Sequence, residues 1–490
     1  MDALHEQTAL ELRDRLRAGD LTPGEVTDHF LERIAARNAE LGAFAHVTPD
    51  AARERAEELA SDAAPPSGTL WGLPTGDKDL WNRAGVPSGF GSRAMAGFVP
   101  EESDDVVRDL DAAGIVSLGK TATPELGFPA YTEPVAGPVA RNPWDLTRGA
   151  GGSSGGAAVA VAAGLLPFAP GSDGGGSVRI PAAACGVVGL KPSRGLLPAG
   201  SGIEGLGGLV VNGPIARTTA DAALLLEGML RRTPDGHVDH RFTLRTPAAH
   251  AGAYLEAART GVAREHGGVV GGHGSRFRVG VTTWNAWQYY YDVTVDPEAR
   301  AALDAGVDAL AGLGHGVEEH TWEPVPEFGD AFRSLWMGGA SAVPIDDDAV
   351  LDRLEPLTSW LVRRGRQVGA RELAEALATL TQFERRLIAG LGELDAVITP
   401  ALAMTPRPVG WFDPEDADRN FVQQCQYTPF TSWLNVAGLP AITVPTHWTD
   451  DGLPMGVQII GRPGGELTLL ALAGQLEDVL RWPERHPPVW

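Results

Sequence analysis

Cysteine and long apolar runs are both scarce in this 490-residue sequence, and each absence excludes a class of protein. Only Cys185 and Cys425 are present, which excludes a disulfide-stapled scaffold and suits a reducing compartment. No run of about 18 apolar residues occurs, so no membrane span is predicted. The first residues lack the basic stretch and apolar run of a secretory signal. We therefore expect a cytoplasmic protein.

Positive charge is also in short supply. The chain has 40 basic and 63 acidic residues, which gives a formal net charge of -23. A negative surface field repels phosphate backbones and anionic lipid headgroups, so we expect no nucleic-acid partner and no membrane partner. The composition, 43% hydrophobic and 21% charged, is that of a folded enzyme with a large core.

Helical and strand-like patterns alternate along the chain. A capping box from Thr22 to Glu25 predicts an amphipathic helix, and helices are also predicted over residues 50 to 61, 296 to 313 and 467 to 480. Short apolar runs predict buried strands at 115 to 118, 187 to 190, 278 to 281, 396 to 399, 441 to 444 and 456 to 460. The segment from Arg231 to Phe277 has no clear pattern and is predicted to be an irregular surface excursion. Because strands come from both ends of the chain, we expect an α/β fold with one mixed central β-sheet covered by helices on both faces.

Three glycine-rich segments carry the chemistry: residues 72 to 79 with Lys78, residues 151 to 156 with Ser153, and residues 171 to 181 with Ser177. A serine nucleophile needs a base, which would be a lysine or a histidine, and none of the 12 histidines lies in these segments. Glycines just before Ser177 would let backbone N-H groups converge on one point, as an oxyanion hole requires. The predicted donors are Gly174, Gly175, Gly176 and Ser177.

These segments together resemble the amidase signature family. The resemblance lies in Gly-Gly-Ser-Ser-Gly-Gly at 151 to 156, in Asp-x-Gly-Gly-Ser-x-Arg ending at Arg179, with Ser177 24 positions after Ser153, and in Cys-Gly-Val-Val-Gly-Leu-Lys-Pro at 185 to 192. Further similar stretches are Gly-Lys-Thr-Ala-Thr-Pro-Glu at 119, Leu-Pro-Ala-Ile-Thr-Val-Pro at 439 and Gly-Leu-Pro-Met-Gly-Val-Gln at 452. The resemblance implies one amidase signature domain over residues 1 to 490, with a catalytic core at about 65 to 230 and 392 to 480 and a variable, more helical region at about 231 to 391.

The family implies a role for each matching residue. Ser177 matches the nucleophile, Ser153 matches a proton relay that follows a cis peptide bond, and Lys78 matches the base. Gly127 aligns near a carbonyl that holds the substrate in relatives. Supporting roles fall to Ser154, Asp173 and Arg179. No cofactor is implied, no metal-ligand spacing occurs, and a homodimer is left open.

Two positions depart from the commoner family pattern. Asp77 stands before the lysine in place of an apolar residue, and Gly174 replaces a Thr or Ile. If Lys78 lies on a strand, Asp77 points to the opposite face and is harmless. If its carboxylate instead curls toward the amine, it favours the ammonium form and weakens the base.

Three other functions compete with the amidase interpretation. Gly-Gly-Ser-Ser-Gly at 151 to 155 also fits the nucleophile elbow of an α/β-hydrolase-like esterase, but that elbow needs a preceding strand, and residues 141 to 148 predict none. The family also includes glutaminase-type amidotransferase subunits. An inactive binding protein is disfavoured because all three triad positions are intact.

The expected substrate is a small or medium amide with an apolar or aryl acyl group. Anilides, cyclic or linear ω-amino-acid amides, esters and carbamates are included, because the core motifs look most like those of aryl acylamidases and nylon-oligomer hydrolases. Phe328, Phe332 and Trp336 fall at helical spacing and are the predicted pocket residues, although packing explains such a stripe equally well. Core packing is likewise the expected role of the aromatic group at 284 to 291, and a solvated helix start that of Asp346 to Asp348.

Overall fold

The computed structural model describes residues 3–61, 68–197, 207–230, 251–265, 268–269, 276–345 and 347–490. The chain begins with three helices, α1 (Ala9–Ala18), α2 (Pro23–Leu41) and α3 (Pro49–Ser61). Helix α2 starts at the predicted capping box, in which the Thr22 hydroxyl accepts from the N-H of Glu25 and the Glu25 carboxylate accepts from the N-H of Thr22. Local sequence alone therefore fixes this helix start.

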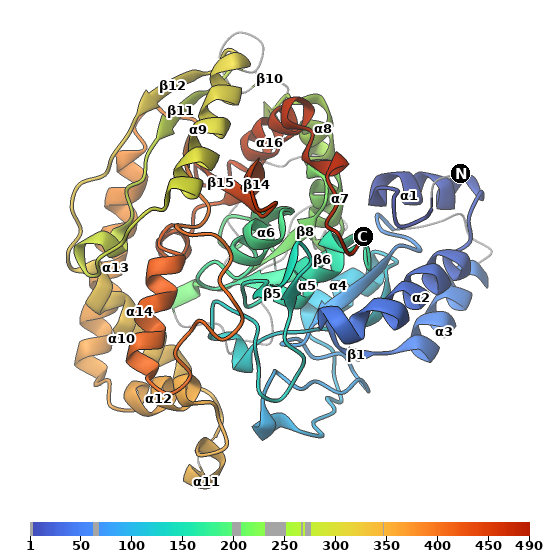
Figure 1. Ribbon diagram of the computed structural model, residues 1–490, viewed down its shortest axis with the longest axis horizontal. Coiled ribbons are helices and arrows are strands. Elements are labelled where there is room, and N and C mark those ends of the chain that lie inside the picture. The colour runs from blue at the N-terminus through green and yellow to red at the C-terminus, as the bar shows by residue number, and fades with distance from the viewer. Residues whose placement is uncertain are drawn as a thin grey trace.

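An eight-stranded mixed sheet forms the centre of the molecule (Figure 1). Its strand order is β12-β11-β13-β15-β14-β7-β8-β6. The strands are β6 (Phe168–Asp173), β7 (Val188–Lys191), β8 (Val211–Ala216), β11 (Arg278–Val281), β12 (Gly316–Glu319), β13 (Ala396–Pro400), β14 (Ala441–Trp448) and β15 (Pro454–Gly461). β11 is parallel to both of its neighbours, and the remaining pairs are antiparallel. Strands from residues 168 to 216 and from residues 278 to 461 thus share one sheet, whereas the predicted strand at 115 to 118 lies in a separate, smaller sheet. The expected mixed α/β fold is confirmed.

The alternation of side chains along β15 separates the two faces of the sheet. Val457 contacts α9 (Pro297–Gly312), and Gly461 contacts α16 (Glu466–Leu480), so α9 and α16 cover one face. Gln458 points the other way and bonds to Arg179 in α6 (Arg179–Cys185). Helices also pack against β6 and β8 at the far end of the sheet: α5 (Gly155–Ala162) and α7 (Thr219–Met229).

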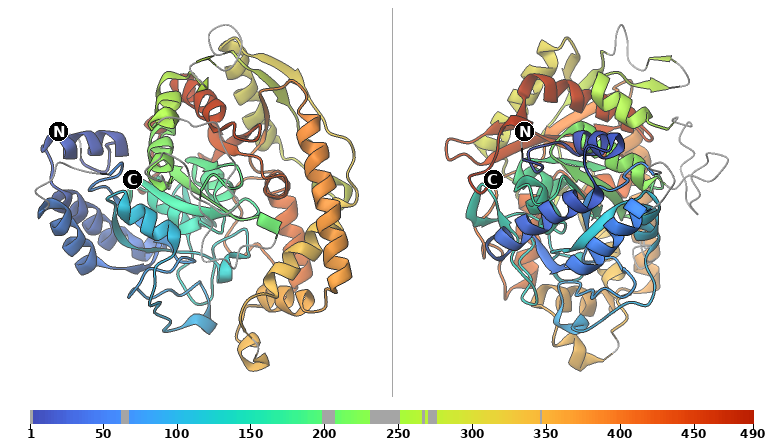
Figure 2. Two further views of the ribbon diagram at one scale, coloured as in Figure 1. Left: turned by 180° about the vertical axis from the view of Figure 1, so that it is seen from behind. Right: turned by 90° about the vertical axis from the view of Figure 1, so that its right-hand side faces the viewer.

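A second, mostly helical layer lies beside the sheet. It contains α10 (Phe328–Ala340), α11 (Asp348–Leu351), α12 (Pro356–Gly365), α13 (Ala370–Gly390), α14 (Ala417–Tyr427) and α15 (Ser432–Ala437). Figure 2 shows α10 to α14 on the side of the molecule opposite to α1 to α3. This layer has its own apolar cluster, which reaches the sheet through Val397, Ala441 and Ile460.

A small sheet carries the first catalytic candidate. It has the order β1-β3-β2, with β1 (Phe44–Val47), β2 (Pro74–Lys78) and β3 (Val116–Thr121), and helix α4 (Asp105–Ala112) leads into β3. Two short strands, β4 (Arg141–Asn142) and β5 (Asp145–Gly149), pair only with each other. The expectation that no strand precedes residues 151 to 155 was therefore wrong, because these few residues close a local hairpin that periodicity does not reveal.

The structure corrects the expectation for residues 231 to 277, and it describes only part of that segment and of Asp346 to Asp348. Helix α8 (Ala253–Thr260) and the short strands β9 (Arg264–Glu265) and β10 (Gly268–Val269) lie in the segment expected to be irregular, because the buried Ala257 and Tyr254 side chains give α8 a tertiary contact face. Residues 231 to 250, 266 to 267 and 270 to 275 of that segment lie outside the described residues. Asp347 caps α11, as expected of a helix start, while Asp346 also lies outside the described residues.

Candidate active site

Lys78 is the last residue of β2, and its side chain is completely buried. Its Nζ lies 2.8 Å from Oγ of Ser153, within hydrogen-bond distance. It also contacts both oxygens of Ser172, donating to Oγ at 3.0 Å and to the carbonyl oxygen at 3.2 Å. The lysine amine is thus held among three oxygen atoms.

Burial lowers the pKa of Lys78 from 10.5 to about 7, because the ammonium form loses its hydration. The carboxylate of Asp173 opposes this decrease. Asp77 does not contribute: it lies on the opposite side of β2, where it is bonded to Nε of Arg83 at 2.5 Å and to Oγ of Ser117 at 2.9 Å. Burial would raise the pKa of Asp77, but Arg83 outweighs it and lowers that pKa. The unusual aspartate therefore faces away from the Lys78 amine, as strand geometry predicts.

Ser153 and Ser177 stand on two loops that are tied together. The Gly152-Ser153 peptide bond is cis, as the family resemblance implies. The N-H of Ser154 donates to the carbonyl of Ser177 at 3.1 Å, which connects the two loops. Ser153 and Ser177 are 2% and 9% exposed, and both line the same cavity together with Ser172 and Gly174. The structure thus brings Lys78, Ser153 and Ser177 to one place.

The glycine loop before Ser177 partly corrects the expected oxyanion hole. The N-H of Gly176 donates to Oδ1 of Asp173 at 2.8 Å, so it is not free to bind an oxyanion. Among the residues that the structure describes, the N-H groups of Gly174, Gly175 and Ser177 have no acceptor. The run of glycines alone does not predict which N-H groups stay free, because the Asp173 carboxylate turns back into its own loop and binds one of them.

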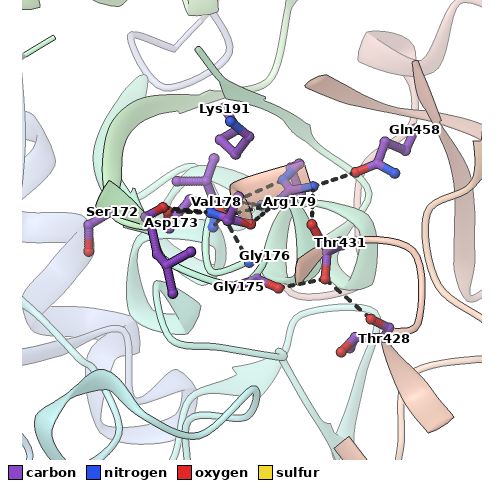
Figure 3. A network of polar contacts seen from close by, with 12 residues as sticks. Ser172, Asp173, Gly175, Gly176, Val178, Arg179, Lys191, Thr428, Thr431 and Gln458 are labelled. Carbon is purple, nitrogen blue, oxygen red and sulfur yellow. Dashed lines mark hydrogen bonds and ion pairs between the residues drawn. The ribbon is translucent and has the colours of Figure 1, made fainter. Parts of the chain in front are cut away.

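A buried ion pair holds this loop in place (Figure 3). Arg179 Nη2 bonds to Oδ1 of Asp173 at 2.8 Å, and both side chains are fully buried. Burial would raise the pKa of Asp173, but Arg179 and Lys191 outweigh it and keep that pKa well below its usual value. Arg179 also donates to Oε1 of Gln458 at 2.6 Å and to the carbonyl of Thr431 at 3.1 Å. The expected bracing role of this pair thus has a full set of contacts.

Two cavities meet at Ser177. The larger has a volume of about 450 Å³ and is lined mainly by apolar side chains. The smaller has a volume of about 60 Å³ and includes the polar side chains of Gln424, Thr428 and Ser432. Phe128 and Trp336 line both cavities, and their rings meet edge to face at 6.0 Å. The site therefore offers an apolar chamber and a narrower, more polar one.

The predicted substrate residues divide between cavity and core. Gly127 and Trp336 line the larger cavity, and Phe332 lines the smaller one. Phe328 does not line either: it is completely buried and packs on the rings of Trp287, Phe332 and Phe383. The prediction for Phe328 was therefore wrong. One face of a helix can line a pocket at one turn and pack into a core at the next, and only tertiary packing separates the two.

Several polar residues of the site escaped sequence reasoning. Thr431 Oγ1 donates to the carbonyl of Gly175 at 2.6 Å, and Asn435 Nδ2 donates to the carbonyl of Asp173 at 2.7 Å and to its Oδ1 at 2.8 Å. Gln458 and Ser172 complete the set. Ser172 lies inside a glycine-rich segment and Gln458 ends the stretch at 452 that resembles the family, so both could have been considered. Thr431 and Asn435 lie more than 250 positions from the loop that they contact and carry no local signal.

The described part of the chain shows neither a candidate metal site nor a candidate membrane-spanning helix. There, no group of three or more His, Cys, Asp or Glu side chains is placed to hold a metal ion. None of the helices in these ranges combines the length and apolar character of a membrane span.

Comparison with known proteins agrees with this geometry. A family model described as amidase matches residues 25 to 470. AmiB2 of Mycobacterium tuberculosis, a presumed amidase, is 36% identical over 97% of this chain and 96% of its own. A solved 6-aminohexanoate cyclic dimer hydrolase in complex with substrate superposes with a TM-score of 0.86, at 30% identity over 99% of each chain. A bacterial aryl acylamidase of the amidase signature family superposes with a TM-score of 0.81, at 25% identity over 99% of this chain and 100% of its own.

The fold and these matches define an enzyme that hydrolyses carbon-nitrogen amide bonds. The chain belongs to the amidase signature family.

Proposed function

We propose that the enzyme cleaves amides through a Ser177 acyl-enzyme, with Ser153 as proton relay and Lys78 as base. The observation that carries the proposal is the buried Lys78 amine, 2.8 Å from Oγ of Ser153 and with a pKa of about 7. At that pKa about half of the lysine is neutral at pH 7.

The contacts of Lys78 suit a neutral amine. Such an amine has two N-H donors and one lone pair, and the two oxygens of Ser172 can accept both hydrogens. The lone pair is then left for the hydroxyl hydrogen of Ser153. Arg179 supports this state indirectly, because it offsets the Asp173 carboxylate, which otherwise favours the ammonium form.

The reaction follows from these positions. Oγ of Ser177 attacks the amide carbon, its proton passes to Ser153, and the Ser153 proton passes to Lys78. The N-H groups of Gly174, Gly175 and Ser177 stabilise the oxyanion of the tetrahedral intermediate. When this intermediate collapses, the leaving amine takes the proton back through Ser153. A water molecule then attacks the acyl-enzyme along the same proton route, releasing the carboxylic acid and free Ser177.

We also propose that the substrate is a small or medium amide with an apolar or aryl acyl group. The larger cavity supports this, because its lining includes Leu80, Trp81, Phe90, Phe98, Leu126 and Trp336. The similar cyclic dimer hydrolase and aryl acylamidase suggest ω-amino-acid amides and anilides, and esters and carbamates are included. We expect a broad substrate range, because an apolar pocket discriminates by only about 1 to 3 kcal/mol per methylene.

The proposal extends to organisation and location. We infer one amidase signature domain over residues 1 to 490, since strands from the catalytic core and from the variable region share the central sheet and the family model matches residues 25 to 470. We infer a cytoplasmic enzyme without a nucleic-acid partner, since the net charge is -23 and only two cysteines are present.

Covalent labelling tests the mechanism. A sulfonyl fluoride should add its mass to Ser177, and Ser177→Ala should be neither labelled nor active. Ser153→Ala serves as the matched control: it should lose turnover but retain slow labelling at Ser177. Labelling at Ser153, or activity retained in Ser177→Ala, would disprove the assignment. A panel of p-nitroanilides with glutamine and asparagine tests the substrate class; hydrolysis of glutamine alone, and only with a partner protein, would replace it with an amidotransferase subunit.

A further inference from the structure

Residues 89 to 91 form an unusual turn beside the active site. Phe90 has a φ of 51° and Gly91 a φ of 61°, so both lie in the left-handed region. Glycine adopts this region easily, but a bulky side chain such as phenylalanine rarely does. The surroundings must therefore hold Phe90 in this conformation.

Asp79 supplies the hydrogen bonds that hold the turn. Its side chain is buried, and each carboxylate oxygen lies 3.2 Å from the N-H of Gly89. The N-H groups of Phe90 and Gly91 lie near the same carboxylate and counter the rise in its pKa that burial causes. On the other side, the carbonyl of Phe90 accepts from the N-H of Leu126 at 2.8 Å. Three successive N-H groups thus converge on one carboxylate, as in an anion-binding nest.

An open space lies on each side of this turn, although Gly91 packs closely against the backbone of residues 123 to 125. Phe90 lines the larger active-site cavity, of about 450 Å³, next to Trp81 and Phe98. Asp79 and the flanking Gly89 and Gly91 line a second cavity of about 510 Å³. The turn lines both spaces, and it is held by this backbone contact, by the Leu126 hydrogen bond and by the hydrogen bonds to Asp79.

We propose that Phe90 is a specificity-determining residue for apolar acyl groups and that Asp79 is the residue that positions it. This role rests on the proposed function, in which the acyl group occupies the larger cavity. The Phe90 ring adds apolar surface to that cavity, and its backbone conformation decides whether the ring faces the substrate. Asp79 follows Lys78 directly in the chain, so the same segment supplies the proposed base and the positioning residue for the pocket wall.

Selectivity between two substrates is the direct test. The measured quantity is kcat/KM for hexanoyl p-nitroanilide divided by kcat/KM for acetyl p-nitroanilide. Phe90→Gly removes the ring and suits the left-handed backbone, and it should lower this ratio about tenfold, mainly through a higher KM for the hexanoyl substrate. Asp79→Asn keeps the size of the side chain and should lower the ratio about threefold, also through KM. A uniform loss of kcat for both substrates would show a merely structural role and overturn the proposal.

A double-mutant cycle separates positioning from an independent effect. If Asp79 acts through Phe90, then adding Asp79→Asn to Phe90→Gly should change the ratio by less than about 1.5-fold. In the control background Val343→Ala, which trims another side chain of the same cavity, Asp79→Asn should still cost about threefold. Full additivity in the Phe90→Gly background overturns the role of Asp79.

The role of Phe90 and the catalytic mechanism can be disproved independently of each other. If Asp79→Asn does not fold, Phe90→Gly alone still decides the role of the ring, and an unchanged or increased ratio in that variant overturns it. Activity retained in Ser177→Ala would overturn the mechanism, whereas an inactive Ser177→Ala with an unchanged ratio in Phe90→Gly would overturn only the assignment of the pocket wall.

Discussion

Replacing Lys78 with methionine should abolish activity and yet stabilise the protein at neutral pH. Methionine has nearly the shape of lysine without its amine, so the buried site stays filled. The fold must accommodate a fully buried amine whose pKa falls from 10.5 to about 7, chiefly because burial penalises the charged form. Methionine removes that penalty along with the proposed base.

The size of the effect follows from linkage between protonation and folding. A pKa difference of about 3.5 between the unfolded and folded states corresponds to about 5 kcal/mol, at 1.36 kcal/mol per pKa unit. Below pH 7 both states bind the proton and the full penalty applies; at pH 7 about 4 kcal/mol remains. The variant loses the neutral amine's hydrogen bonds to Ser153 and Ser172, which together contribute about 2 kcal/mol. Lys78→Met should therefore be about 2 kcal/mol more stable at pH 7.

The pH dependence has a definite sign. Between pH 7 and pH 10.5 the unfolded state holds the lysine proton and the folded state does not, so the natural protein gains stability as the pH rises. The advantage of the variant should shrink by about 1.4 kcal/mol per pH unit and vanish near pH 9.

Urea unfolding at pH 7, 8 and 9 measures this difference, with the fluorescence of the 13 tryptophans as the signal. Lys191→Met is the matched control, because Lys191 is equally buried, with a pKa that burial lowers to about 7, but lies outside the proposed triad. It should show a similar stability trend and retain turnover, because Arg179 still pairs directly with Asp173. A stability difference for Lys78→Met that is independent of pH, or a variant less stable at pH 7, would refute a neutral buried Lys78.

Three further outcomes follow from the same contacts. The rate kcat/KM on acetyl p-nitroanilide should rise about tenfold per pH unit below pH 7 and level off above it, because only neutral Lys78 accepts the proton; a pH-rate profile with an optimum below pH 6 would contradict this. Gly176→Ala should lower kcat at least about a hundredfold in steady-state assays, because the new Cβ would lie 2.4 Å from Oγ1 of Thr431 at a φ of 130°; near-normal turnover would show that the loop can relax. Asn435→Ala leaves two carbonyl oxygens and one Oδ1 short of a donor and should cost about 2 to 4 kcal/mol in urea unfolding, whereas a loss below about 0.5 kcal/mol would mean that the loop does not need this brace.

Local patterns predicted those elements whose causes are local. The capping box of Thr22 and Glu25 starts α2 where expected, and the apolar run at 456 to 460 lies within β15. Periodicity failed where the cause was distant. Helix α8 forms within a segment of weak pattern because Tyr254 and Ala257 are buried against other elements, and Phe328 turns from a pocket residue into a core residue because Trp287 and Phe383 enclose it.

The candidate site shows the same division. The glycine-rich segments and the resemblance they carry pointed to Lys78, Ser153 and Ser177, because the chemistry of a serine amidase restricts which residues can stand there. The sequence does not predict the direction of each N-H group. Whether the Asp173 carboxylate binds the N-H of Gly176 depends on the folded shape of one loop.

The sequence by itself determined the family, the mixed α/β class and the three residues of the proposed triad, because these depend on residue identity and short spacing. Only the tertiary structure decided the rest. It decided that Lys78 is buried deeply enough for its pKa to fall to about 7, and that Asp77 faces away from it. It decided which aromatic side chains reach the cavity at Ser177. Burial and cavity shape arise from groups far apart in the sequence, such as Gly175 and Thr431, and folding alone brings those groups within a few ångströms of one another. Even the ion pairs between residues six positions apart depend on the folded direction of their side chains.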